Sequence, residues 1–205
     1  TLSVTADSEL SVASGYTLEL SQDGGLSLGA NTLTLSGGGS LESGGLYLDN
    51  ASSKLLLNSI TVDNVSTSAD SLGLDVDANS TVTSLTVAHT TPVSIASTKT
   101  LSGAITVSGG SVKLDEAGTL ASTVAMSGGT LDADNSSTLS GALSQGGNIT
   151  IDVASGKTLT YSGDEISLGA YTLTMSGGGA FSNTNDLVLS NASSKLLLDS
   201  ITVDS

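Results

Sequence analysis

Pairs of acidic residues are the groups whose type and spacing could do chemistry in this chain. The pairs are Asp75 and Asp77 in LDVDAN, Asp132 and Asp134 in LDADNSS, and Asp115 with Glu116. On a β-strand, residues two apart point to the same face, so the first two pairs each bring two carboxylates together. Calcium takes six to eight oxygen ligands, and stacked pairs could supply some of them. The nonapeptide calcium repeat GGxGxDxUx does not occur, so we favour a solvated acidic face, with weak divalent-ion binding as the alternative.

Catalytic chemistry has few candidates in the sequence. His89, in TVAHTTP, is the only histidine, there is no arginine, and the single proline, Pro92, lies three residues further on. Polysaccharide lyases need strong bases and cations that hold acidic sugar, and hydrolases need paired carboxylates in a walled cleft. His89 is therefore expected to be a loop residue. We predict that the chain is not an enzyme and has no catalytic, cofactor-binding or metal-binding residues and no cofactor.

Two lysines occupy the same place in a repeated block. Lys54 and Lys195 both lie in NASSKLLLxSITVD. We expect each to point outward at a corner and to neutralise a nearby aspartate.

Rows of threonine are a further candidate surface. They are Thr32 with Thr34, Thr172 with Thr174, and Thr61 with Thr202. A flat ladder of hydroxyls resembles the surface of ice-binding solenoids, but that function requires constant spacing. The spacing here is irregular, so the β-propensity of threonine accounts for the rows.

Charge and composition exclude several classes of partner. The net charge is −15 and the pI is about 4.1, with only five lysines and arginines together. Nucleic acid and anionic membrane surfaces both require basic residues, so neither is an expected partner. The longest apolar runs are far too short to insert into a membrane. With 38% hydrophobic residues and a mean hydropathy of +0.23 the chain should fold, but aromatic residues make up only 2%. The interior is expected to consist of Leu, Val, Ile, Ala and Thr, and the tyrosines to lie near turns on the surface.

A long internal repeat organises the chain. Residues 14–63 return as residues 155–204, and the blocks LGAxTLTxSGGG and NASSKLLLxSITVD survive almost unchanged. Repeats of this kind bury their apolar faces against their neighbours. We expect residues 1–205 to form a single unit cut from a longer repetitive array.

Apolar and polar residues alternate in short bursts between Gly-rich and Asn-rich turns. Examples are Leu33 and Leu35, Ile105 and Val107, and the turn signal at Asp23-Gly24. This period of two predicts strands and almost no helix. A sandwich or antiparallel barrel would need hairpin signals and aromatic anchors, which are scarce. Insertions between the two copies fall only in turns, which favours an all-β, right-handed parallel β-helix (β-solenoid). A recurring corner pattern predicts about eleven coils of about 17–20 residues.

The SGG and NSST turns that lead into TLSG, TLTL or KLLL strands resemble the β-solenoid passenger repeats of bacterial autotransporters and very large surface adhesins. The resemblance covers the whole chain in style and period. It implies a structural stalk of a secreted bacterial surface adhesin or extracellular filament, located outside the cell or on its surface. Expected partners are end-to-end copies, neighbouring repeats of the same chain, or a host or matrix glycan or protein. The alternatives are a glycan-binding or partner-binding side face and a carbohydrate-active β-helix enzyme.

Overall fold

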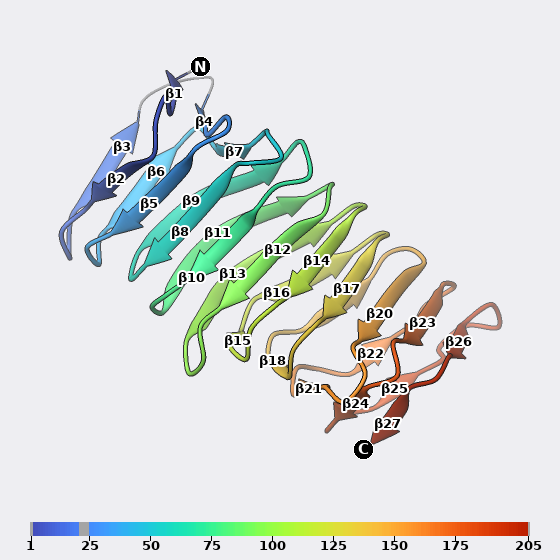
Figure 1. Ribbon diagram of the computed structural model, residues 1–205. Helices are drawn as coiled ribbons and strands as arrows, with labels where there is room; N and C mark the ends of the chain where they lie inside the picture. The colour runs from blue at the N-terminus through green and yellow to red at the C-terminus, as the bar shows by residue number, and fades with distance from the viewer. Residues whose placement is uncertain (1, 21–24, 205) are drawn as a thin grey trace.

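The computed structural model describes residues 2–20 and 25–204 of the chain, and the turn signal at Asp23-Gly24 lies outside these residues. The described residues form strands, turns and bends without any helix, so none of them provides a helix that could cross a membrane. Two long sheets run the length of the molecule, and all strand pairs in them are parallel. Figure 1 shows the coils stacked from the N-terminus at one end to the C-terminus at the other. The predicted all-β parallel β-solenoid is confirmed, and the right-handed sense stays a prediction from the crossover rule.

One sheet takes a single strand from each successive turn of the chain, so its ten strands are separated by nine steps. In order along the molecule its ten strands are β2 (Ser8–Ser11), β5 (Thr32–Ser36), β8 (Lys54–Asn58), β10 (Gly73–Val76), β12 (Thr91–Ile95), β14 (Ser111–Leu114), β17 (Thr130–Ala133), β20 (Ile149–Val153), β23 (Thr172–Ser176) and β26 (Lys195–Leu198).

The fifteen-stranded sheet forms the opposite wall, where some coils contribute one long strand and others two short ones. Its strands are β1 (Leu2–Ser3), β3 (Thr17–Leu20), β4 (Leu26–Ser27), β6 (Ser40–Ser43), β7 (Leu46–Leu48), β9 (Thr61–Thr67), β11 (Ser80–Val87), β13 (Thr100–Val107), β15 (Thr119–Leu120), β16 (Thr123–Met126), β18 (Ser137–Leu139), β19 (Leu143–Gln145), β21 (Thr158–Tyr161), β24 (Ala180–Asn183) and β27 (Thr202–Asp204). A separate two-stranded sheet joins β22 (Ile166–Ser167) to β25 (Leu187–Val188).

The coils are longer and fewer than the sequence pattern predicts. There are about nine coils roughly 21 residues apart, in place of eleven coils of 17–20 residues. Individual steps range from 19 residues, between Leu74 and Val93, to 25 residues, between Ser8 and Leu33. The corner pattern does not distinguish the two walls: Val62 ends up in the fifteen-stranded sheet and Val76 in the ten-stranded one. Because some neighbouring corners lie on different walls, the spacing between them is shorter than one full coil.

The core follows from the alternation of apolar and polar residues. Each strand turns every second residue inward, so Leu33, Leu55 and Leu74 stack directly on one another and are buried. The same register continues along both walls and gives one continuous apolar core. Each coil therefore buries its apolar side against the coils on either side of it, as expected of a solenoid.

Aromatic residues contribute more to this core than composition suggests. Tyr161 is fully buried and stacks on Phe181 with ring centroids 6.1 Å apart. The Tyr161 hydroxyl donates to the carbonyl of Asp164 at 2.7 Å and accepts from the backbone N–H of Leu143 at 3.1 Å. The expectation that the tyrosines cover the surface is therefore wrong for Tyr161, whereas Tyr16 is indeed exposed. A buried ring is tolerated here because its polar end has two backbone partners.

The two copies of the repeat have matching corners. Ser59 and Ser200 both adopt positive φ angles, of 59° and 55°. The side chain of Asp7 accepts the backbone N–H of Thr32 at 2.8 Å, and Asn148 accepts that of Thr172 at 2.9 Å. Since Asp7 and Asn148 precede residues 14 and 155 by the same seven positions, the structural correspondence begins before the sequence repeat is obvious.

Candidate functional site

The outer face of the ten-stranded sheet gathers acidic side chains around Lys113. Asp132 lies opposite Lys113 in the strand register, and the Lys113 Nζ is 3.0 Å from its carboxylate. Asp134, two residues further on, lies 3.3 Å from the same nitrogen. Asp115 follows β14 as Asp134 follows β17, so its carboxyl belongs to the same face. The strand period of two thus brings three carboxyl groups and one ammonium group together.

Partial burial shapes the charges of this cluster. Desolvation raises the pKa of Asp132, against the opposing effect of its hydrogen bond from Lys113. Desolvation also raises the pKa of Asp115, and repulsion from Asp134 adds to it. The hydrogen bond to Asp132 is the main cause that raises the pKa of Lys113. Lys113 is therefore held as a cation and compensates part of the negative charge.

This arrangement bears on the predicted choice between a solvated acidic face and weak divalent-ion binding. Asp77, Asp134 and Glu116 are exposed, as an outward face requires. The position between Asp132 and Asp134 holds the Lys113 ammonium group. Within residues 2–20 and 25–204, no three His, Asp or Glu side chains form a group that could hold a metal ion.

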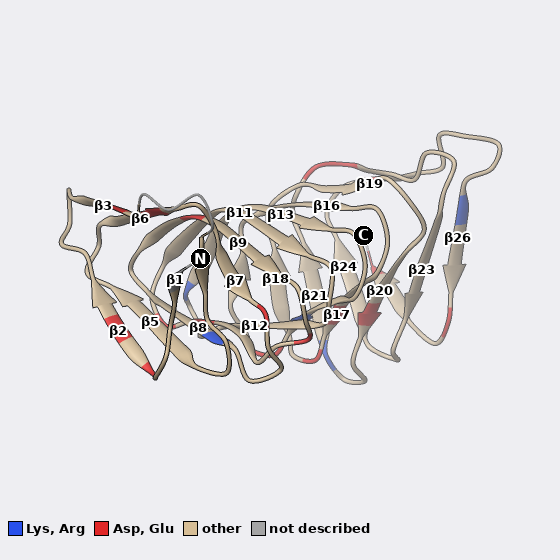
Figure 2. Ribbon diagram, turned by 90° about the horizontal axis from the view of Figure 1, so that it is seen from above, with Lys and Arg blue, Asp and Glu red and all other residues tan. Residues whose placement is uncertain are grey.

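The predicted role of Lys54 is confirmed. Lys54 begins β8, and its Nζ lies 2.5 Å from the carboxylate of Asp75 on the next coil. Lys195 begins β26, the last strand of the same sheet, and is exposed. Figure 2 shows how sparse the basic positions are among the acidic ones, with the β26 lysine at the extreme C-terminal end.

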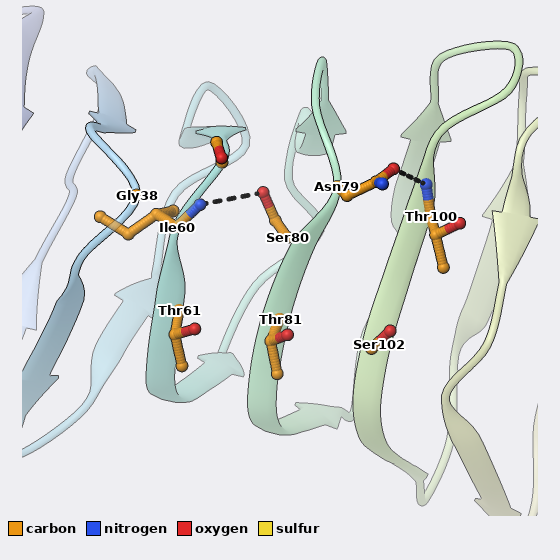
Figure 3. Close-up of a pocket in the computed structure, with 9 residues that line it drawn as sticks. Gly38, Ile60, Thr61, Asn79, Ser80, Thr81, Thr100 and Ser102 are labelled. Atoms are coloured by element: carbon orange, nitrogen blue, oxygen red, sulfur yellow. Dashed lines mark hydrogen bonds between the residues drawn. The ribbon is translucent and has the colours of Figure 1, made fainter. Parts of the chain in front are cut away.

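A hollow of about 380 Å³ lies on the surface of the fifteen-stranded sheet. Its lining is Gly38, Ser59, Ile60, Thr61, Asn79, Ser80, Thr81, Thr100 and Ser102. Figure 3 shows Thr61, Thr81 and Ser102 in a row on successive strands, as the register requires. The Asn79 side chain accepts the backbone N–H of Thr100 at 3.0 Å. The lining has hydroxyl and amide groups and no charged side chain, so the hollow can donate and accept hydrogen bonds but offers no acid or base.

His89 is a loop residue, as predicted. It is exposed in the turn between β11 and β12, and its carbonyl accepts the Thr91 hydroxyl at 3.3 Å. Pro92 lies within β12 and faces outward. The threonine pairs Thr32 with Thr34 and Thr172 with Thr174 flank buried leucines and also face outward.

Sequence reasoning missed the Asn and Asp side chains that bind backbone across the corners. Besides Asp7, Asn79 and Asn148, Asp70 accepts the backbone N–H of Thr90 at 2.9 Å, and Asp49 accepts that of Gly29 at 2.9 Å. These acceptors satisfy N–H groups at corners, where the ladder of strand hydrogen bonds is interrupted. Asp7, Asn79 and Asn148 each lie one residue before a strand, which is a signal that the sequence carries, whereas Asp49 follows β7 and Asp70 lies three residues before β10. These polar side chains therefore serve the fold.

The fold and these surfaces define a parallel β-solenoid repeat protein. A scan against protein-family profiles matches no family, and searches of curated proteins and of solved structures find no significant match.

Proposed function

We propose that this chain is a non-catalytic structural segment, a stiff spacer in the stalk of a secreted bacterial surface adhesin or extracellular filament. The observation that carries the proposal is the unbroken ladder of parallel strands from β2 to β26, with one apolar core beneath it. Bending one coil against the next would break several backbone hydrogen bonds and open the core at once. A molecule built in this way holds its two ends at a fixed separation.

The surface chemistry supports the same role. A net charge of −15 keeps a long repetitive surface soluble and limits lateral association. Lys113 compensates part of the charge of the acidic cluster, and the hollow carries no acid or base. The extracellular bacterial location rests on the resemblance of the turn and strand motifs to adhesin and autotransporter repeats.

Stiffness can be tested by measuring the distance between two spin labels. The chain has no cysteine, so Ser14→Cys and Ser193→Cys, both exposed, provide two unique attachment sites at opposite ends. We expect a narrow distribution centred at about 40 Å, because about eight steps of roughly 4.8 Å separate the two coils. A distribution as broad as that of a flexible chain would contradict the spacer function. Release of reducing ends from a panel of polysaccharides would contradict the non-catalytic part of the proposal.

The hollow on the fifteen-stranded sheet supports a second candidate, a glycan-binding side face. Its row of Thr61, Thr81 and Ser102 could exchange hydrogen bonds with sugar hydroxyls. A glycan array tests this function. Binding that Thr81→Val abolishes, and that the exposed control Thr83→Val leaves intact, would favour it over a passive stalk. Absence of binding across the array would exclude it for the glycans displayed.

A further inference from the structure

Six asparagines lie in the tripeptide Asn-x-Ser/Thr, which is the acceptor sequence for N-linked sugars. The structure describes all six: Asn50, Asn64, Asn79, Asn135, Asn148 and Asn191. In a chain rich in Ser and Thr such tripeptides also arise by chance, so the sequence alone does not select among them. The fold does select, because a sugar can be attached only where the tripeptide is accessible and where the asparagine Nδ2 does not support the structure.

Only two of the six tripeptides are exposed along their whole length, those that begin at Asn50 and Asn191. Both read Asn-Ala-Ser, and they occupy the same turn in the two copies of the repeat, between β7 and β8 and between β25 and β26. Strand β8, which follows the Asn50 turn, pairs with β5 on one side and with β10 on the other. The Asn50 turn therefore lies inside the stack, and its exposure does not depend on where the described chain ends.

The other four tripeptides are partly buried in the walls of the solenoid. At Asn64, Asn79 and Asn148 the middle residue of the tripeptide is buried in a strand. At Asn135 the third residue, Ser137, is buried, and the Asn135 Nδ2 donates to a backbone carbonyl of the preceding coil at 3.4 Å. A transferase can reach these four tripeptides only if part of a coil leaves its wall.

The side chains of Asn50 and Asn191 hold their turns through the oxygen. The Asn50 Oδ1 accepts the backbone N–H of Ser52 at 2.9 Å, and the Asn191 Oδ1 accepts that of Ser193 at 2.9 Å. Within the part of the chain that the structure describes, neither Nδ2 donates a hydrogen bond. By contrast, Asn31 lies outside any acceptor tripeptide, and its Nδ2 donates to a carbonyl of the preceding coil at 2.6 Å. An N-linked sugar replaces one hydrogen of Nδ2 and leaves Oδ1 unchanged, so it is compatible with both turns.

We propose that Asn50 and Asn191 are N-glycosylation sites. The inference goes beyond the spacer function and rests on the proposed secretion of the chain, because this modification belongs to surface loops of secreted proteins. The sugar donor is a glycosyl diphosphate. A bond forms between Nδ2 and the anomeric carbon of the sugar, and the bond from that carbon to the diphosphate breaks. The diphosphate leaves with the electron pair, and the proton lost from Nδ2 passes to a base of the transferase.

The two sites recur at the same corner of the coil. They precede β8 and β26, the third and the tenth strands of the ten-stranded sheet, so seven steps of about 4.8 Å place them roughly 34 Å apart along the rod. Two bulky, hydrophilic sugars at this separation do not crowd each other. Each copy of the repeat thus carries one site, and the sugars add solubility without touching the strand ladder.

Occupancy is tested by peptide mass spectrometry of the protein recovered from the cells that produce it. We expect the peptides that contain Asn50 and Asn191 to carry a hexose or an N-acetylhexosamine, and those that contain Asn64 and Asn135 to be bare. Bare Asn50 and Asn191 would overturn the inference. Recovery of the protein only from inside the cells would instead contradict the proposed secretion, so cell fractionation distinguishes the two failures.

Two substitutions separate the sugar from the fold. Asn50→Asp keeps the oxygen that accepts the N–H of Ser52 but has no Nδ2, and Ser52→Ala removes only the hydroxyl group of the tripeptide. Both variants, expressed in the same cells, should lose the sugar at position 50 completely and keep it at Asn191. Produced without a transferase, they should unfold at nearly the same urea concentration as the wild type. Ser52→Thr restores the tripeptide and is the matched control; a sugar that persists in Ser52→Ala would refute the assignment.

Selection by the fold is tested on the purified, folded chain with UDP-glucose and a soluble asparagine glycosyltransferase. We expect Asn50 to react at least about tenfold faster than Asn64, because a site within β9 reacts only after local opening of the strand. In a tryptic digest of the same protein this difference should disappear. Equal rates at Asn50 and Asn64 in the folded chain, or no reaction at Asn50, would contradict the proposal.

Discussion

At the scale of single residues, Tyr161 shows how this narrow core accepts a polar atom. Its ring packs on Phe181, and its hydroxyl satisfies the N–H of Leu143 and the carbonyl of Asp164. We expect Tyr161→Phe to lower the free energy of unfolding by about 1–2 kcal/mol, because the buried N–H of Leu143 loses its partner. Urea denaturation followed by circular dichroism measures the change. Tyr16→Phe, at an exposed position, should have no effect, and equal losses for the two variants would contradict this role of Tyr161.

Asp115 makes the stability of the protein depend on pH. Burial raises its pKa above the usual value, so the folded state binds the proton more readily than the unfolded state does. Its contribution to stability is therefore most favourable below the unfolded pKa of about 3.8 and is lost as the pH rises through the higher folded pKa.

We expect Asp115→Asn to stabilise the protein by about 0.5 kcal/mol at pH 7, a modest value because the group is partly solvated. The gain should vanish near pH 3, where the carboxyl is protonated in both states. Thermal unfolding at the two pH values checks this. Asp77→Asn removes the same charge from an exposed position and serves as the control. A gain in stability for Asp115→Asn that is larger at pH 3 than at pH 7 would contradict the raised pKa of Asp115 in the folded state.

At the scale of elements, Gly103 allows β13 to pair with β11 beside a β-bulge. The register between the two strands shifts between Val82 and Leu85, and Gly103 lies opposite Val82 with a φ of 126°. A Cβ at this position would come within 1.7 Å of the Val82 carbonyl oxygen. Only glycine fits without moving the neighbouring coil.

We expect Gly103→Ala to destabilise the protein by about 3 kcal/mol or more, from backbone strain together with the steric clash. The matched control is Gly15→Ala. Gly15 also has a positive φ, of 80°, but a Cβ there would meet no atom within 4 Å. The control should therefore cost only about 1 kcal/mol of backbone strain. Similar midpoints of urea denaturation for the two variants would contradict the packing of β11 against β13.

Strand pairing explains which features the sequence could predict. The alternation around Leu33 and Leu35 predicts a strand with one buried face, and the stacking of like residues predicts parallel coils. The contacts between coils could not be predicted, because the step between them varies from 19 to 25 residues. The contact between Lys113 and Asp132 can be predicted only if the exact number of residues in the step between their coils is known. An error of one residue would reverse which face each side chain occupies.

At the scale of the whole molecule, the chain is a rod whose parts repeat along one axis. Ten strands of one sheet are separated by nine steps of about 4.8 Å, so its first and last strands lie roughly 43 Å apart. Stability then arises from contacts between neighbouring coils rather than from a compact centre.

The most direct test of this account is small-angle scattering on dilute protein. We expect an elongated monomer with a constant cross-section and a length near that of nine stacked coils, unchanged by calcium or by a chelator. A compact particle of the same mass would contradict the solenoid and the spacer function together. Collapse of the rod on chelation would show that the acidic face binds a metal ion on which the fold depends.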